Sequence, residues 1–189
     1  MEMWFSPAMK TTVATAFLTI ILILLIGPGA AGAQAGDQAG SLKAAFIYNF
    51  AKFVDWPAKA LPGAGGPFLI GVLGTGTLAD NLRALEGKSV KGHQIQIKNL
   101  LQPEDGKSCH LLVITNADRR QASQIITAIR GHSVLTVGDE VDNFLNIGGI
   151  INLVSVDAKI RFEINTKAAQ QADLQISSQL LKLALLIKE

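Results

Sequence analysis

Two short continuous apolar runs constrain the fold more than any other feature of the chain. Residues 68–73 (FLIGVL) and 110–115 (HLLVIT) contain almost no strongly polar side chains. Runs of this length are typical of strands buried on both faces, as in parallel sheets covered by helices on each side. They are followed by segments with apolar residues at helical spacing, at 77–85 and 118–130. Alternating strands and helices predict an α/β fold with a mostly parallel, Rossmann-like sheet flanked by helices.

Two further strands and one helix complete this pattern. Residues 93–100 alternate between apolar and polar side chains and predict a half-buried strand, and residues 133–137 predict another. Residues 42–54 have the spacing of a helix, with Ser41 as its N-cap and an end before Pro57. The apolar face expected for this helix comprises Leu42, Ala45, Phe46, Asn49, Phe50, Phe53 and Val54.

The C-terminal part departs from the alternation. Residues 149–156 and 159–165 are separated by two residues and predict a hairpin, which adds an antiparallel strand at one edge of the sheet. Residues 166–172 predict a short helix. The last eleven residues, 179–189 (QLLKLALLIKE), follow a capping Ser177 and predict a helix that is apolar nearly all round. Such a helix is buried or lies in an interface.

The N-terminus is typical of an exported protein. Lys10 precedes an almost wholly apolar stretch at 13–26, and small residues follow it. This arrangement predicts a signal peptide over residues 1–35, cleaved after Ala33 or Ala35, with an uncleaved N-terminal anchor as the alternative. Either way, the remainder is exported, and we expect it to be periplasmic. It consists of a flexible leader at 36–40 and one domain at 41–189, which is long enough to bury a substantial core.

Charge and cysteine content narrow the function. Seventeen basic and fifteen acidic residues leave a net charge of +2, so neither nucleic acid nor an anionic membrane is predicted as a partner. Cys109 is the sole cysteine, and the chain therefore has no internal disulfide. We interpret Cys109 as a thiol buried at the start of a strand. The alternative is a disulfide between two chains in an oxidising compartment.

A glycine turn raises the question of a cofactor. Gly74, Gly76 and Ala79 form G-x-G-x-x-A between a strand and a helix, the context of a dinucleotide site. The next strand ends in Lys98 and Asn99, however, where such a site has a carboxylate for the ribose. We therefore interpret the glycines as making a tight turn, and no cofactor is expected. An anion or a small polar ligand at the turn is an alternative, and an NAD-type oxidoreductase is a third hypothesis.

The carboxyl edge of the predicted sheet is where a small ligand would bind. The candidate residues there are Gly74, Thr75, Gly76, Thr77, Asn116 and Asp139. Asp118 and Glu140 lie at the same edge, but the acidic residues lack a histidine partner and the dense spacing of a metal site, so no metal is expected. No catalytic motif occurs. The protein is therefore expected not to be an enzyme.

The order of several longer stretches resembles the YfiR family of exported proteins. These stretches are SLKAAFIYNFAKFVDWP, GKSVKGHQIQIKNL, CHLLVI, VLTVGDEVDNFLNIGGIINLV, KIRFEINTKAA and ISSQLLKLA. Together they run from Ser41 to Lys188, nearly the whole exported chain. No one of them is a catalytic signature, so the resemblance rests on their number and order.

The resemblance implies a periplasmic α/β regulator without known catalysis. Its best understood members inhibit inner-membrane diguanylate cyclases by binding the periplasmic sensor region, and their release raises cyclic-di-GMP and favours biofilm. Such members form homodimers and use disulfides for stability. Cys109 has no second cysteine to pair with in this chain, so disulfide-based redox control is not expected. A periplasmic small-ligand-binding protein that uses the carboxyl edge is the alternative function.

A regulator of this kind needs an apolar surface for its partner. Aromatic side chains often dominate binding at such surfaces. Tyr48 and Trp56 lie off the main apolar face of the first helix, and Phe53 lies near its end. We therefore expect Tyr48, Phe53 and Trp56 to bind the partner. The Leu-rich C-terminal segment is a second candidate surface.

Overall fold

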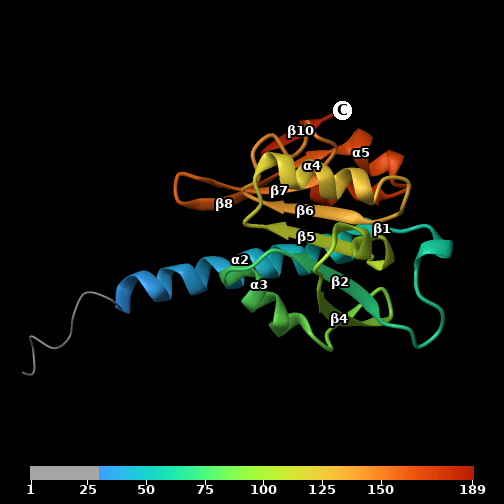
Figure 1. Ribbon diagram of the computed structural model, residues 1–189, viewed down its shortest axis with the longest axis horizontal. Coiled ribbons are helices and arrows are strands. Elements are labelled where there is room, and N and C mark those ends of the chain that lie inside the picture. The colour runs from blue at the N-terminus through green and yellow to red at the C-terminus, as the bar shows by residue number, and fades with distance from the viewer. Residues whose placement is uncertain (1–29) are drawn as a thin grey trace, which may run out of the picture. The chain divides into compact units, whose positions relative to one another are not determined.

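The central feature of the fold is one sheet in the order β10-β8-β7-β6-β5-β2-β4-β3 (Figure 1). It is seen in a computed structural model that describes residues 30–189, with side chains from residue 37 onward. Five of the seven strand pairings are parallel, which confirms the predicted mostly parallel α/β sheet. The strands are β2 (Phe68–Leu73), β3 (Ser89–Val90), β4 (His93–Asn99), β5 (Leu111–Thr115), β6 (Leu135–Asp139), β7 (Ile151–Val156), β8 (Lys159–Asn165) and β10 (Leu186–Lys188).

Helices and short turns connect these strands. The helices are α2 (Ala30–Phe53), α3 (Thr77–Leu82), α4 (Arg119–Ala128), α5 (Thr166–Gln171) and α6 (Ser178–Leu181). Short 3-10 turns occupy Ala58–Ala60, Arg83–Leu85 and Pro103–Ser108. A separate antiparallel pair joins β1 (Val54–Asp55) to β9 (Gln175–Ile176). Within residues 30–189, no helix combines the length and the hydropathy that crossing a bilayer demands.

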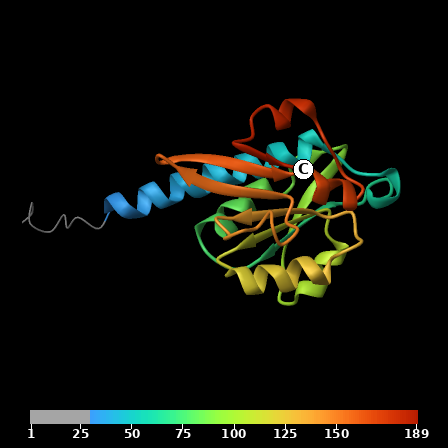
Figure 2. The ribbon, with the colours of Figure 1, turned by 90° about the horizontal axis from the view of Figure 1, so that it is seen from above.

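The sheet is covered on both faces, as its apolar central strands require. Leu111 and Val113 of β5 belong to the core on the side of α2 and α3. Leu112 and Ile114 alternate with them and pack into a second core on the side of α4. Figure 2 shows α2 and α4 on opposite sides of the sheet. Both faces of a strand can be apolar only in this arrangement, because successive side chains point in opposite directions.

Helix α2 buries a face that only partly matches the expected one. Its buried apolar residues are Ala44, Ile47, Phe50 and Ala51, and Val54, directly after its end, is buried as well. Leu42, Ala45, Asn49 and Phe53, which were assigned to the apolar face, are exposed instead. The prediction is confirmed for Phe50 and Val54 and wrong for these four residues, because the buried stripe is rotated toward Ala44, Ile47 and Ala51. Small alanines can face the sheet because they allow the close approach that dense interior packing requires.

The start of α2 also differs from the prediction. The helix runs from Ala30, so Ser41 lies inside it and is not an N-cap, and residues 36–40, predicted as a flexible leader, are part of the helix. Hydrogen bonds to α3 hold the helix at residues 37 and 41. Ser41 Oγ donates to Asn81 Oδ1 at 2.6 Å, and Asn81 Nδ2 donates to Asp37 Oδ1 at 3.1 Å. The predicted signal peptide lies outside the described residues except for the six at 30–35.

The C-terminal segment is the largest departure from the sequence prediction. In place of a helix over 179–189, the chain forms the single turn α6 and then β10, which pairs in parallel with β8. The predicted hairpin of β7 and β8 is present, but β8 is not the edge strand, because β10 lies outside it. Leu185 N–H donates to Phe162 O at 2.8 Å. The open edge of β8 supplies backbone partners that outweigh the local preference for helix.

The leucines of this segment are also not buried. The exposed large apolar residues there are Leu183, Leu185, Leu186 and Ile187. The helix predicted from their periodicity is therefore wrong. Of the two environments expected for it, the core and an interface, the core is excluded for these four residues. Ser177 does cap α6 as expected, since its hydroxyl accepts from Leu180 N–H at 3.2 Å.

Cys109 lies just before β5 and is buried, which confirms the first interpretation of its sequence position. Burial raises the pKa of its thiol. A Cβ at Gly71 would stand 2.6 Å from the Cys109 sulfur, so the glycine on β2 provides the space that this side chain occupies. A disulfide to another chain would require this packing to open.

An aromatic and histidine cluster fixes the start of β5 against β2. The indole N–H of Trp56 donates to His110 O at 3.1 Å, and the Trp56 ring packs edge-on against Phe68 at 5.1 Å between centroids. The His110 ring stacks on Phe68 at 4.8 Å, and its Nδ1 accepts from Leu69 N–H at 2.9 Å. Burial and the nearby His93 lower the pKa of His110, so the ring is neutral at neutral pH.

The buried, neutral His110 should make stability depend on pH. Its pKa is lower in the folded state than its ordinary value of 6.5, so the unfolded chain binds more protons. The free energy of unfolding should therefore be highest above pH 6.5 and fall below it, by at most about 1.4 kcal/mol per pH unit. Denaturant unfolding at several pH values checks this.

The matched variants for this measurement are His110→Gln and, as control, His132→Gln at an exposed site. His110→Gln should reduce the pH dependence below 6.5, and His132→Gln should retain it. An identical pH slope in all three proteins would contradict the assignment.

Candidate functional site

The connections of β2 and β5 create a crevice at the carboxyl edge of the sheet. From β2 the chain passes through α3 to β4 on one side, and from β5 it passes through α4 to β6 on the other. Helix α3 packs into one core and α4 into the opposite one. Ligands of open α/β sheets bind at such a reversal of strand order, just beyond the carboxyl ends of the strands. A cleft of about 910 Å³ lies at this point.

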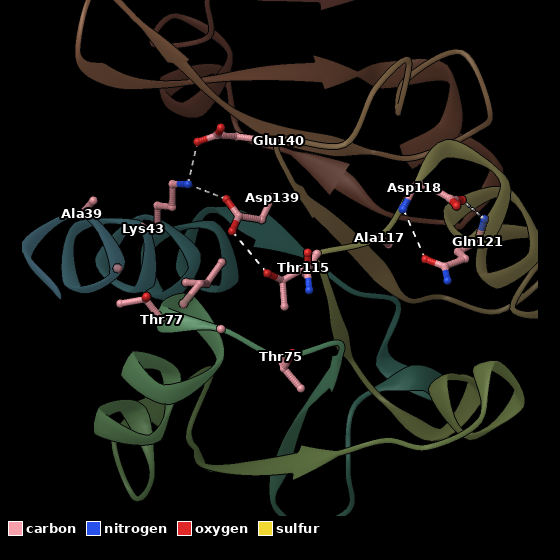
Figure 3. Close-up of a pocket in the computed structure, with 14 residues that line it drawn as sticks. Ala39, Lys43, Thr75, Thr77, Thr115, Ala117, Asp118, Gln121, Asp139 and Glu140 are labelled. Carbon is pink, nitrogen blue, oxygen red and sulfur yellow. Dashed lines mark hydrogen bonds and ion pairs between the residues drawn. The ribbon is translucent and has the colours of Figure 1, made fainter. Parts of the chain in front are cut away.

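Side chains from four regions of the chain line the cleft (Figure 3). The turns after β2, β5 and β6 supply most of them, and α2 closes one side with Lys43. Five of the six residues predicted as ligand-binding lie here: Thr75, Gly76, Thr77, Asn116 and Asp139. Gly74 is not among the lining residues. The structure therefore brings the predicted residues together, while binding itself remains a proposal.

Gly74 has a structural role in the turn. Its φ of +111° lies in the region that favours glycine, and a Cβ there would stand 1.9 Å from Thr115 O. Gly76, with φ of +119°, precedes α3. These two positions account for the G-x-G pattern without a nucleotide, because each needs backbone freedom that other residues lack.

Lys43 forms the electrostatic centre of the cleft. Its Nζ lies 2.6 Å from Asp139 Oδ1 and 2.7 Å from Glu140 Oε1, as the dashed lines in Figure 3 show. Thr115 Oγ1 donates to the other oxygen of Asp139 at 3.3 Å, and Ser155 Oγ donates to Glu140 at 2.8 Å. The ion pairs thus connect α2 to the loop between β6 and β7.

The proximity of these charges changes their ionisation. Burial acts to lower the pKa of Lys43, but hydrogen bonds and charge interactions with Asp139 and Glu140 outweigh it, and the pKa is raised. The hydrogen bond from Lys43, followed by that from Ser155, lowers the pKa of Glu140 below its ordinary value of 4.5. Both groups are therefore charged across the neutral range.

The cleft is poorly suited to a dinucleotide. Its ionisable side chains are Lys43 and the carboxylates of Asp118, Asp139 and Glu140, which together carry a formal charge of −2. The ammonium group is already engaged by two carboxylates, so a pyrophosphate would meet net negative charge. Among the described lining residues there is also no aromatic ring on which a base could stack and no histidine.

Sequence reasoning missed Lys43 and Gln121 as cleft residues. Gln121 forms a capping box with Asp118 at the start of α4: its backbone N–H donates to Asp118 Oδ1 at 2.8 Å, and its side chain accepts from Asp118 N–H at 3.2 Å. Lys43 lies directly before Ala44 on the buried side of α2. Its position beside the buried face of a helix could have indicated this role, because a partly buried charge needs a partner of opposite charge.

The three predicted partner-binding residues lie in different environments. Phe53 is 36% exposed at the end of α2. Tyr48 is half-buried, and its hydroxyl donates to Ser89 O at 3.0 Å. Trp56 is only 7% exposed and belongs to the core beside Phe68. The premise that Trp56 offers free surface is therefore wrong, because its ring packs against Phe68 and its indole N–H is bonded to His110 O.

Together, the fold and the cleft define an α/β protein with a mostly parallel sheet and a polar, net acidic crevice at its switch point. The YfiR/HmsC-like family model matches residues 40–185. This range covers most of the chain, and the protein therefore belongs to the YfiR/HmsC-like family.

Comparison with solved structures supports the fold. A conserved domain protein from Vibrio cholerae O1 biovar El Tor is similar with a TM-score of 0.52 and 15% identity, over 79% of this chain. The match covers 60% of the Vibrio chain, so this chain spans less than two thirds of it. At this identity the likeness concerns the fold alone. The comparison with curated proteins finds no match.

Removing the Lys43 ammonium should raise the pKa of Glu140. The variant Lys43→Met deletes the largest cause of the lowered value and leaves the smaller effect of Ser155. Carbon-detected NMR titration of the Glu140 carboxyl group measures the change. Lys107→Met, at an exposed position outside the cleft, is the control. An unchanged Glu140 pKa in Lys43→Met would refute the ion-pair geometry.

Substitution at Gly74 should be strongly destabilising. Gly74→Ala combines a positive φ with a clash against backbone, and we expect a loss of about 3 kcal/mol in the free energy of unfolding. Gly63→Ala is the matched control, because Gly63 has open space around it and no positive φ. Chemical denaturation of the two variants should separate them clearly, and equal stabilities would show that the turn tolerates a side chain.

Proposed function

We propose that the protein is a non-enzymatic periplasmic regulator that binds the periplasmic sensor region of a membrane-bound diguanylate cyclase and inhibits the enzyme. The family match over residues 40–185 is the observation that carries this proposal. It covers every strand of the sheet except β10, together with α3 to α6 and the second half of α2. A signal peptide at the N-terminus would deliver the domain to the compartment in which a sensor region is accessible.

The exposed stripe of α2 is the best candidate for the partner surface. Leu42, Ala45, Asn49 and Phe53 are all exposed. They follow one another at intervals of three and four residues and therefore share one helical face. Leu42 is 50% exposed and Phe53 36%, while the small Ala45 lies between them. A helix or strand of a partner can approach such a face closely and bury its apolar ends.

Inhibition would follow from occupancy. A sensor region held by the regulator cannot reach the arrangement that activates the cyclase, and a signal that weakens the complex releases it. The size of this effect cannot exceed the difference in affinity between the two states of the sensor. We further propose that the regulator acts as a homodimer, with the exposed C-terminal leucines as a second contact surface.

Substitutions on the α2 stripe test the proposal. In membranes that contain the cyclase of the same organism, added wild-type protein should lower cyclic-di-GMP synthesis. Leu42→Asp or Phe53→Asp should weaken inhibition at least about tenfold, because a charge would enter the buried contact. Leu101→Asp, at a residue that is 88% exposed and lies outside α2, should inhibit normally.

The readouts for this test are cyclic-di-GMP production and co-purification of the tagged mature protein with its membrane partner. Circular dichroism should first establish that each variant is folded. No inhibition and no recovered sensor protein with folded wild-type protein at micromolar concentration would rule out the cyclase as partner. Equal inhibition by all three variants would move the interface away from α2.

A small-ligand-binding role is the second candidate, and the cleft favours it. The polar crevice lies where α/β proteins bind ligands and collects residues from separate turns. Its volume is within the range of small-molecule sites. This role does not exclude the first one, since a ligand could be the signal that changes the affinity for the partner.

A further inference from the structure

Two carboxylates of the cleft bind an ammonium group that belongs to the protein itself. Asp139 and Glu140 jointly hold a primary ammonium group, that of Lys43, at 2.6 and 2.7 Å. The ammonium is not part of the sheet edge itself but is brought there by a side chain of α2 (Figure 3). The Lys43 ammonium thus lies where the ammonium group of a small ligand could also bind.

We propose that the cleft binds a small hydroxylated molecule carrying an ammonium group, and that this ligand displaces Lys43 from Asp139 and Glu140. The proposal deepens the ligand-binding role put forward above and rests on it. It assigns the ligand class and identifies Lys43 as an internal competitor for the site.

The remaining lining groups favour hydroxyl groups on the ligand. No hydrogen bond among the described residues uses the side-chain polar atoms of Thr75, Thr77 or Asn116. All three side chains are exposed at the cleft, and each can both donate and accept. A ligand with several hydroxyl groups would satisfy both kinds of site, whereas a purely apolar body would leave them unpaired.

The charge of the cleft favours a cation over an anion. When Lys43 leaves, Asp118, Asp139 and Glu140 remain as three carboxylates around the crevice. They would repel a phosphate or carboxylate ligand. An ammonium group would restore the positive charge that is lost when Lys43 moves away. The volume of about 910 Å³ is ample for a molecule of the size of an amino sugar.

Displacement of Lys43 would also change α2. The ion pairs of Lys43 tie α2 to the start of the β6–β7 loop. Without them, the side-chain hydrogen bonds that hold this part of α2 within the described residues are those of Asp37 and Ser41 to Asn81. Leu42 of the proposed partner surface lies beside Lys43. A ligand that releases Lys43 therefore alters the surface that meets the partner, and the two affinities are coupled reciprocally.

D-glucosamine and D-glucose are the matched probes, because they differ only by an ammonium in place of one hydroxyl group. Calorimetric titration is carried out with the folded mature protein at a pH where the amino sugar is protonated. Glucosamine should bind at least about tenfold more tightly than glucose. Asp139→Asn should weaken glucosamine binding about tenfold, while Lys107→Met should leave it unchanged.

Lys43 variants test whether the lysine competes with the ligand ammonium for Asp139 and Glu140. If the lysine competes, Lys43→Met should strengthen glucosamine binding about tenfold, and Lys43→Gln should do so as well if the first variant folds poorly. In wild-type protein, the NMR signal of the Lys43 Nζ group should shift on saturation with glucosamine but not with glucose.

Three results would overturn the inference. They are equal binding of the two sugars, no glucosamine binding by wild-type and Lys43 variants at millimolar concentration, and weaker binding in the folded Lys43 variants. The measurements use no cyclase, so these results would leave inhibition of the enzyme standing. Conversely, if the protein binds glucosamine as expected but does not inhibit the cyclase, the proposed partner is wrong and the ligand proposal stands.

Discussion

Burial of β2 and β5 on both faces is the constraint on which the rest of the structure depends. Strands with apolar side chains on two faces must lie inside a sheet that is covered twice, so their connections must pass over both sides. Helix α3 follows β2 on one face and α4 follows β5 on the other. The crevice between their starts is a consequence of that division. The place of the candidate site is thus fixed by core packing, before any polar residue is considered.

The Lys43 ion pairs show how α2 is joined to this sheet. Lys43 and Asp139 are largely buried and Glu140 is half exposed. Taking charges out of water is costly, and the attraction between them offsets the cost only when the geometry is close. Here Thr115 and Ser155 supply further hydrogen bonds to the two carboxylates. The cluster thus places one point of α2 against the carboxyl edge and brings its exposed stripe and the cleft within one helix turn of each other. This proximity connects the two proposed functions physically.

Sequence patterns predicted the position of the cleft residues but not the environment of Trp56 or the structure of the C-terminal leucines. The turn residues Thr75 and Asn116 could be assigned to one edge because parallel strands end together. Trp56 could not be placed, since its burial depends on Phe68 and His110, which lie far from it along the chain. The exposed leucines of β10 had helical spacing, yet the open edge of β8 decided their structure. Where a segment's hydrogen-bond partners are remote in sequence, local periodicity is a weak guide.

The sequence by itself determined the class of fold, the alternation of strands and helices, the hairpin and the carboxyl edge at which polar residues gather. These follow from local apolar periodicity, from chain reversals at turns and from the direction shared by parallel strands. Only the tertiary structure decided which face of α2 is buried, that the chain ends in a strand, and that Lys43 meets Asp139 and Glu140. Each of these depends on contacts between residues distant in sequence, and no local pattern records the distance between two such charges.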